Sequence, residues 1–176
     1  MSKTPLLAAA LAVLVALPAF ATNDNYRPIN NQNYLLHDDD GPWQEGPYTL
    51  PPYPENPDWV GFYAPLKKDF KFYVDSKSIS MGDDHVIRLI LRVVSNSGAE
   101  NISYEGFQCI NRQMRAYAFG DTTDKRWIES TRALWKNIVG SDDPVRERLA
   151  DDMCPQWDWP ANAAEALARI KASPWR

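Results

Sequence analysis

The stretch from Val86 to Val94 alternates between two kinds of side chain, and this pattern limits the fold more than any other part of the sequence. Aliphatic residues fill its odd positions, namely Ile87, Leu89, Leu91 and Val93. Two of its even positions are arginines, Arg88 and Arg92. Because successive side chains of a strand point to opposite faces of the sheet, the stretch predicts a β-strand with one face buried.

Three further stretches have the character of strands, and they are residues 70–74, 102–110 and 114–119. Asn96-Ser97-Gly98 supplies turn chemistry between two of the strands. Gly106, inside a strand, indicates a bulge or a close approach of another group to the backbone. The sequence therefore predicts a four-stranded antiparallel β-meander over residues 70–119.

The C-terminal third is expected to be helical. Apolar residues recur there at steps of three and four, at Trp127, Thr131, Leu134, Trp135 and Ile138. Asp143-Pro144 combines an N-cap residue with proline at the first helical position, which predicts a helix through residue 153. A second helix, rich in alanine, is expected over residues 161–172. A sheet followed by helices predicts an α+β fold in which the C-terminal helices cover the apolar sheet face.

The segment before the meander has a different composition. Half of the fourteen prolines lie between Pro42 and Pro65, and proline disfavours long helices and central strands. The segment also holds aromatic residues at Trp43, Tyr48, Tyr53, Trp59, Phe62 and Tyr63. A plain disordered tail would contain fewer aromatic rings. We interpret residues 22–56 as an extended or partly disordered arm rich in proline and aromatic residues, which precedes a single domain over residues 57–176.

The first 21 residues have the layout of a secretory signal peptide. Lys3 is followed by an apolar run from Leu6 to Leu17, a proline, and the small-x-small pattern Ala19-Phe20-Ala21. A membrane-spanning helix needs about 20 apolar residues, and this run has twelve. We therefore expect cleavage after Ala21 and export to the periplasm. Secretion or association with the outer membrane would fit the same signal.

The charge of the mature chain argues against two classes of partner. Loss of Lys3 leaves 18 basic against 23 acidic residues, a net charge of −5. Nucleic acids and anionic membrane surfaces attract basic patches, so neither is expected as a partner. The mature chain has no second apolar stretch long enough to span a bilayer. The oligomeric state is left open by the sequence.

The chain has two cysteines, Cys109 and Cys154. In an exported chain the simplest interpretation is one disulfide. It would close a loop of about 46 residues and stabilise the fold by about 4 kcal/mol through the entropy of the unfolded chain. A redox or nucleophilic cysteine is the alternative, but the sequence has no C-x-x-C motif.

The sequence contains no recognisable catalytic or metal-binding motif, and we expect no cofactor and no metal. The histidines, His37 and His85, lie far apart in the sequence. The acidic run after His37 lacks the spaced ligands of a calcium loop. Carboxylate doublets such as Asp83-Asp84 do not form acid–base pairs by themselves, because adjacent side chains point apart.

The candidate binding residues lie on the second face of the predicted sheet. Arg88 and Arg92 point away from the core there, and the register decides whether Glu105 and Arg115 join them. Guanidinium groups on one face could bind an anion or the carboxylate of a partner. The simpler interpretation is cross-strand charge pairing on a solvated face.

Two arm tryptophans are the other candidates. Trp43 and Trp59 could form a platform for a sugar or a peptide, although core packing is the more common role of such rings. We expect the remaining tryptophans to pack between the helices and the sheet.

Several runs of the chain are familiar from a known family. They are Val74-Asp75-Ser76-Lys77-Ser78-Ile79-Ser80, the run Ser97-Gly98-Ala99-Glu100-Asn101-Ile102-Ser103-Tyr104-Glu105-Gly106-Phe107-Gln108-Cys109, Tyr117-Ala118-Phe119-Gly120, and the paired Trp127 and Trp135. Over roughly residues 57–155, the chain resembles the cryptic neisserial protein-like family of exported proteobacterial proteins. It is distantly similar to surface-adhesin E type domains as well. The resemblance implies export and one small domain, and it implies no activity and no catalytic residue.

Three functional hypotheses follow. The first is an exported, envelope-associated binding or interaction module without catalytic chemistry, with an envelope protein as its partner. The second is a periplasmic binder of small anions or metabolites that uses Arg88, Arg92 and Arg115. The third is an envelope hydrolase with an unrecognised site, which would need Asp75, Glu105 or His85 to lie beside an arginine in a pocket.

Overall fold

The computed structural model describes residues 43–64 and 69–173. The expected signal peptide and the first part of the arm lie outside these ranges, as do His37 and Trp175.

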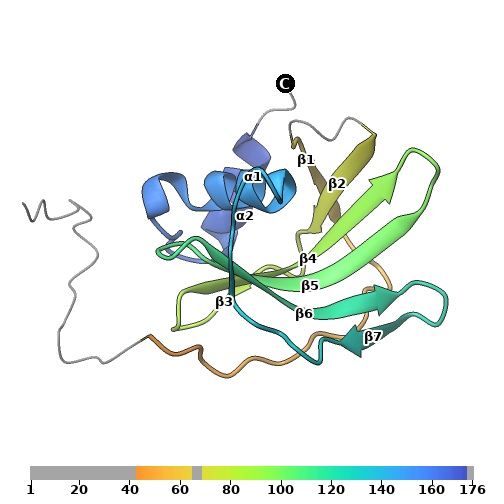
Figure 1. The fold of residues 1–176 in the computed structure, drawn as a ribbon, viewed down its shortest axis with the longest axis horizontal. Coiled ribbons are helices and arrows are strands. Elements are labelled where there is room, and N and C mark those ends of the chain that lie inside the picture. Colours follow the sequence, from red (N-terminus) through yellow and green to blue (C-terminus); the bar gives the residue numbers. More distant parts are fainter. Residues whose placement is uncertain (1–42, 65–68, 174–176) are drawn as a thin grey trace, which may run out of the picture. The chain divides into compact units, whose positions relative to one another are not determined.

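The described residues form an antiparallel sheet with two C-terminal helices, so the expected α+β class is confirmed (Figure 1). The strands are β1 (Trp59–Phe62), β2 (Phe70–Asp75), β3 (Ser80–Met81), β4 (Val86–Ser95), β5 (Glu100–Gln108), β6 (Gln113–Asp121), β7 (Arg126–Glu129) and β8 (Lys136–Asn137). The order is β1-β2-β4-β5-β6-β7, while β3 pairs with β4 and β8 pairs with β6. The four expected meander strands are β2, β4, β5 and β6.

The expected count of four strands is too low, because the structure adds four short strands, β1, β3, β7 and β8. None of them exceeds four residues, which is too short for a side-chain alternation to stand out in a sequence. Strand β1 follows directly on the arm and pairs with the outer edge of β2, from Trp59 opposite Asp75 to Phe62 opposite Phe72.

The helix expected over residues 127–138 is wrong. The chain forms β7, a turn and β8 there, and both strands pair with β6. Pairing with β6 satisfies the backbone groups of this segment and covers the edge of the sheet. The residues that suggested a helix do not share one face: Trp127 and Trp135 donate to the arm, at the carbonyl oxygen of Pro51 and at Glu45, whereas Leu134 is exposed and Ile138 joins the helix-side core.

Both expected helix starts in the last third of the chain are present. Helix α1 (Pro144–Met153) begins after Asp143, whose side chain accepts a hydrogen bond from the backbone of Arg146 at 3.2 Å. Helix α2 (Ala163–Ala172) begins after Asn162, two residues later than the expected start at residue 161. Among the described residues, no helix has the length and apolar character needed to cross a bilayer.

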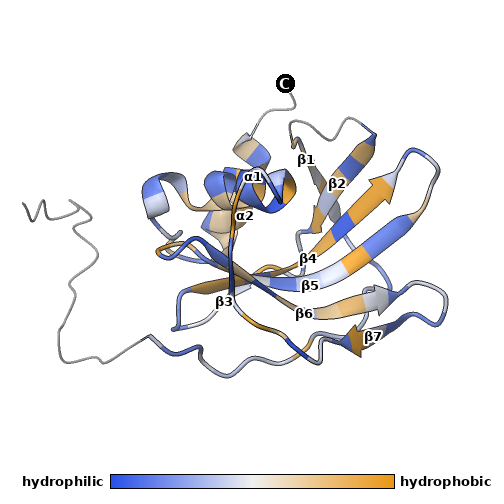
Figure 2. Ribbon diagram, in the orientation of Figure 1, coloured by the Kyte–Doolittle hydropathy of each residue, from blue (hydrophilic) through white to orange (hydrophobic). Residues whose placement is uncertain are grey.

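The helices cover one face of the sheet, on which the odd residues of β4 lie. Ile87, Leu89 and Leu91 are fully buried and belong to one core with Leu149 of α1 and Ile170 of α2. Figure 2 shows that β4 is mostly hydrophobic and is interrupted by a few hydrophilic residues. The sequence pattern therefore identified the core face of this strand correctly.

The disulfide between Cys109 and Cys154 is present, with the two Cα atoms 5.4 Å apart. Cys109 follows the last residue of β5, and Cys154 caps the end of α1. The bond therefore ties the helical layer to the centre of the sheet, as the sequence predicted.

The opposite face of the sheet is not solvated, and the arm covers it. Figure 1 shows the segment that leads into β1 running along the sheet on the side away from α1 and α2. A second core lies between them, formed by Ile90, Ile102, Tyr104, Tyr117 and Ala118. Leu50 and Tyr53 of the arm pack against this core. The sheet is consequently buried on both faces.

Glu105 lies on the helix face and not beside Arg88, so the possibility that it joins the arginines is ruled out by the register. Strand pairing places Glu105 opposite Leu89 and Gly106 opposite Arg88. The carboxylate of Glu105 is fully buried and receives hydrogen bonds from Arg146 Nη2 at 2.6 Å and Nε at 3.1 Å. Ser103 donates a third hydrogen bond at 2.6 Å.

Replacement of Arg146 by alanine should destabilise the fold by about 3 kcal/mol or more, because it leaves the Glu105 carboxylate buried without its counter-charge. Urea denaturation of the purified protein measures the change. Arg126→Ala is the matched control, since the side chain of Arg126 is 64% exposed and its loss should change the free energy of unfolding by less than about 0.5 kcal/mol. Equal unfolding midpoints for the two variants would contradict the prediction.

Candidate functional site

The candidate site lies where the arm crosses the sheet. Residues 43–56, the described part of the arm, contain no helix or strand. Both side chains and backbone groups hold the segment on the sheet, and a single glutamate makes the largest set of these contacts. The side chain of Glu45 is only 9% exposed, and its carboxylate meets donors from β4, β6 and the segment before β8.

Four side chains donate hydrogen bonds to this carboxylate. Arg88 Nη2 lies 3.0 Å from Oε1, and Trp135 Nε1 lies 3.1 Å from Oε2. Arg115 donates through Nη1, and Tyr117 donates through its hydroxyl group. We call Glu45, Arg88, Arg115, Tyr117 and Trp135 the Glu45 site.

The register of three central strands brings the two arginines together. Arg88 on β4 and Arg115 on β6 both lie opposite Gly106 on β5, so both side chains point to the arm face. Gly106 leaves space between them for the ring of Tyr117, since a Cβ atom at Gly106 would lie 2.3 Å from the Tyr117 hydroxyl oxygen. The close approach expected from this glycine is confirmed.

Tyr117 points to the same face as Arg115, because it lies two residues later on β6. A β-bulge follows there, since the pairing of β5 with β6 joins Tyr104 to Ala118 and Glu105 to Ala116 and leaves Tyr117 as the extra residue. Burial is the main cause that raises the pKa of Tyr117, and the hydrogen bond to Glu45 raises it further. The phenol therefore remains a donor at neutral pH.

A second carboxylate, Asp84, completes the charge balance around Arg88. Its oxygens accept from Arg88 Nη2 at 2.6 Å and from the backbone N–H of Gly46 at 2.9 Å. Burial is the largest single influence and raises the pKa of Asp84, but the hydrogen bonds and charge of Arg88, together with two backbone donors, hold that pKa below its ordinary value. Asp84 thus links the arm to the turn before β4.

Aromatic rings border the paired guanidinium groups. The Arg115 guanidinium carbon lies 5.2 Å from the ring centre of Tyr117 and 5.8 Å from that of Tyr48. Such distances allow a cation–π attraction. The buried Nε atoms of Arg88 and Arg115 donate to no acceptor among the described residues. The two arginines therefore offer more hydrogen-bond donors than the arm uses.

The structure separates Arg92 and Trp59 from the Glu45 site. Arg92 pairs with Glu100 and lies over the ring of Trp59, with its guanidinium carbon 5.3 Å from the ring centre. Both residues border an open groove of about 500 Å³. Trp43 lies instead beside the Glu45 site, where its ring meets Trp135 edge-on at 5.4 Å. The two arm tryptophans thus contact different residues.

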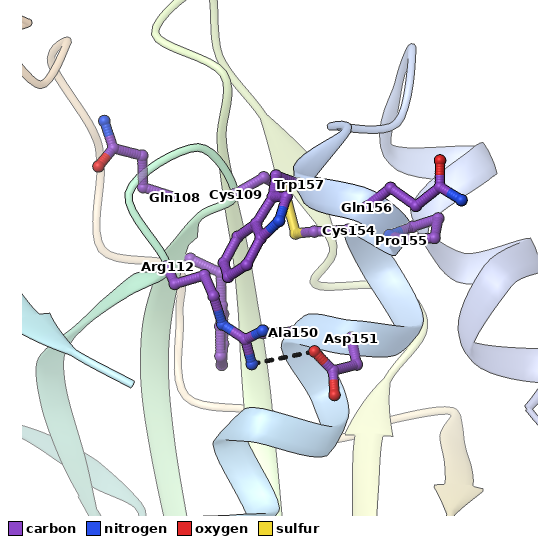
Figure 3. Close-up of a pocket in the computed structure, with 10 residues that line it drawn as sticks. Gln108, Cys109, Arg112, Ala150, Asp151, Cys154, Pro155, Gln156 and Trp157 are labelled. Carbon is purple, nitrogen blue, oxygen red and sulfur yellow. Dashed lines mark ion pairs between the residues drawn. A yellow bond between two sulfur atoms is a disulfide. The ribbon is translucent and has the colours of Figure 1, made fainter. Parts of the chain in front are cut away.

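A small pocket of about 210 Å³ lies beside the disulfide (Figure 3). Arg112 points toward Asp151 there, with 3.0 Å between their charged atoms. The ring of Trp157 lies 4.4 Å from the Arg112 guanidinium carbon and is 45% exposed. The expectation that Trp157 packs between helices and sheet is therefore wrong.

The residues proposed for hydrolysis make their contacts at three separate places. Asp75 accepts a hydrogen bond from the backbone of Asp58 at 2.8 Å. His85 stacks on Trp159 with 4.2 Å between the ring centres. Glu105 pairs with Arg146 under the helices.

Sequence reasoning identified Arg88 and Arg115 as candidates and missed Glu45, Tyr117 and Trp135. Glu45 is an acidic residue between the arm aromatics Trp43 and Tyr48, and this spacing was the available signal. An arm that rests on a basic sheet face should carry an acid among its anchoring rings.

Asp84→Asn should weaken the fold by about 2 kcal/mol at neutral pH, the range for a lost hydrogen bond to a charged group. A carboxyl group whose pKa is lower in the folded state stabilises the fold above its unfolded pKa of about 3.9 and loses this effect as pH falls through the folded pKa. The difference between wild type and variant in urea unfolding should therefore be constant at neutral pH and shrink below about pH 4.

The exposed Asp124, 59% accessible, supplies the control substitution Asp124→Asn. It should leave the free energy of unfolding within about 0.5 kcal/mol of wild type. A wild-type advantage over Asp84→Asn that persists unchanged to the lowest pH would contradict the assignment.

Comparisons with known proteins show the family to which the chain is related. The model of the CNP1-like family matches residues 38–171, a range that includes the whole Glu45 site. The chain is 29% identical over 146 residues to "Cryptic neisserial protein 1" of Neisseria gonorrhoeae, which covers 73% of this chain and 71% of that protein. No solved structure matches the chain. The breadth of the family match means that the chain belongs to the CNP1-like family.

Proposed function

We propose that this protein is a non-catalytic binding module of the bacterial cell envelope. One observation carries the proposal: the sheet face away from the helices already binds an extended segment, through two arginines that converge on one carboxylate. Arginine, tyrosine and tryptophan are the residues that most often dominate binding interfaces, and the Glu45 site contains all three.

The form of the arm supports a recognition surface. Its described part has no regular secondary structure, yet Glu45 reaches a nearly buried position. An irregular segment held by anchoring side chains resembles a bound peptide more than an integral layer of a core.

Export to the periplasm is part of the proposal. The signal peptide pattern supports it, and a disulfide is typical of oxidising compartments. Intact-mass measurement under non-reducing conditions, on protein recovered from the envelope fraction, should give the mass of residues 22–176 less about two hydrogens for the disulfide. A mass that includes the leader, or thiols that react with iodoacetamide without reduction, would contradict export or the bond.

Partner capture tests the binding function. Wild-type protein, Arg115→Gln and Arg126→Gln are used as bait after cross-linking in envelope extracts. Arg115 belongs to the site, whereas Arg126 is an exposed arginine at the end of the same hairpin. We expect a protein that is enriched by wild type and Arg126→Gln and recovered at least five-fold less with Arg115→Gln, because a lost charge-assisted hydrogen bond typically costs about 1.5–3 kcal/mol.

Two outcomes would remove the proposal. One is that no protein is enriched over a mock bait. The other is that the Arg115 and Arg126 variants recover the same partners in equal amounts.

A small-anion binder is the second candidate, and the convergence of Arg88 and Arg115 on one carboxylate favours it. Such a site would not include Arg92, which is paired with Glu100. The hydrolase hypothesis gains no comparable support, since Asp75, Glu105 and His85 contact different parts of the molecule.

A further inference from the structure

We propose that the Glu45 site is a receptor for an acidic side chain of a partner protein, and that Glu45 is a tethered occupant which the partner displaces. The ligand is an extended segment with a carboxylate flanked by aromatic residues. This inference rests on the proposed binding function and names the chemistry of its partner.

The donors of the site lie on strands of the sheet, whereas its acceptor lies on a segment without regular secondary structure. Arg88 and Arg115 lie on β4 and β6, inside the sheet, and Gly106 between them fixes their spacing. The Arg88 side chain is only 5% exposed. The acceptor, in contrast, comes from a segment without helix or strand. The donors are thus preorganised, while the acceptor can leave without breaking a β-ladder.

Arg88 and Arg115 carry more N–H donors than the carboxylate of Glu45 accepts hydrogen bonds from. The described structure gives Arg115 a single hydrogen bond to Glu45, through Nη1. The Nε atoms of Arg88 and Arg115 are buried and meet no acceptor among the described residues. An arginine fork is most stable when it binds a carboxylate with two parallel hydrogen bonds. A carboxylate that is free of the arm's geometry could engage these remaining donors.

Contacts on both sides of Glu45 indicate a peptide and not a small anion. Trp43 donates to the carbonyl oxygen of Asp84 at 3.2 Å. On the other side, the Tyr48 ring centre lies 4.2 Å from that of Tyr117. Recognition therefore extends over at least the six residues from Trp43 to Tyr48, a length that a free anion does not have.

The arm and a partner segment compete for the Glu45 site, and the arm has the advantage of being part of the same chain. Because the arm is joined to β1 by a short stretch of the same chain, it stays at a high effective concentration beside the site. The partner segment can bind only to molecules in which the arm has left the site. Its apparent dissociation constant for the wild-type protein is therefore the intrinsic constant divided by the fraction of such open molecules. Weakening the arm should therefore strengthen binding of a free segment, which a purely structural arm would not do.

A synthetic peptide that copies residues 43–57, labelled with a fluorophore, is the probe, and full-length proteins are the receptors. Its affinity for Glu45→Gln should be at least ten-fold higher than for wild type. The matched control is Glu55→Gln, the same substitution at an exposed arm residue, which should bind like wild type. Glu45→Gln combined with Arg115→Gln should lose the gain.

The peptide itself supplies a second comparison. A version with glutamine at the position of Glu45 should bind the Glu45→Gln protein at least ten-fold more weakly, a factor that corresponds to about 1.4 kcal/mol. Trp43→Ala is a further receptor, in case Glu45→Gln does not fold. Trp43 is 41% exposed, so its loss loosens the arm without leaving a buried charge unpaired, and it should also raise peptide affinity.

Three results would overturn the inference. The first is equal peptide affinity for wild type, Glu45→Gln and Trp43→Ala, including the absence of saturable binding to all three. The second is equal binding of the acidic and glutamine peptides. The third is displacement of the peptide by succinate at the same concentration, which would define a small-anion site. Because this assay uses no envelope extract, its failure is distinguishable from a failure to capture an envelope partner.

Discussion

The pairing of β4 with β5 places Leu89 opposite Glu105 and Arg88 opposite Gly106. Side chains alternate along a strand, so a slip of one residue would exchange the two faces. A slip of β5 would move Glu105 to the arm face, and a slip of β4 would move Arg88 under the helices, and in each case the moved side chain would lose its present partner. The alternation of aliphatic residues along β4 fixes this register, because only one choice buries Ile87, Leu89 and Leu91 against α1 and α2.

Two layers cover the sheet, the helices on one face and the arm on the other, and each cover forms a buried ion pair with the sheet. The sheet supplies the acidic partner in one pair and the basic partner in the other. On the helix face, the sheet supplies the acid, Glu105, and the helix supplies Arg146. On the arm face, the sheet supplies Arg88 and the arm supplies Glu45. A buried ion pair contributes little net stability, but loss of one partner is costly. Loss of either partner of a pair would therefore weaken the contact between that layer and the sheet.

The two covers differ in what else holds them. The helices share a large apolar core with the sheet, and the disulfide ties α1 to the end of β5. The described arm adds fewer apolar residues, Leu50 and Tyr53, to the smaller second core. Because the arm is held by fewer apolar contacts and by no disulfide, we expect the arm and not the helices to be displaced by a partner. Under the proposed binding function, this asymmetry makes the arm the layer that a partner would displace.

Much of the fold could be predicted from sequence because its signals are local. Alternation identified β4, Asp143-Pro144 identified the start of α1, and two cysteines in a chain that begins with a signal-peptide pattern identified the disulfide. Strands of two to four residues, such as β3 and β7, could not be found, since their existence depends on the edge or partner that they pair with. For the same reason the apparent helical period through Trp127 and Trp135 was misleading.

For the candidate site too, one part could be predicted from the sequence and the rest required the tertiary structure. The sequence by itself determined that Arg88 points away from the helix-side core, because alternation is a property of the strand alone. Only the tertiary structure decided that Arg115 and Tyr117 join it, that Glu105 does not, and that Glu45 lies between them. Strand register and the bulge are set by pairing between separate strands, and the path of the irregular arm at the Glu45 site is set by contacts between residues 38 to 90 positions apart. No local pattern encodes such contacts, because each depends on the free energy of the whole packed sheet.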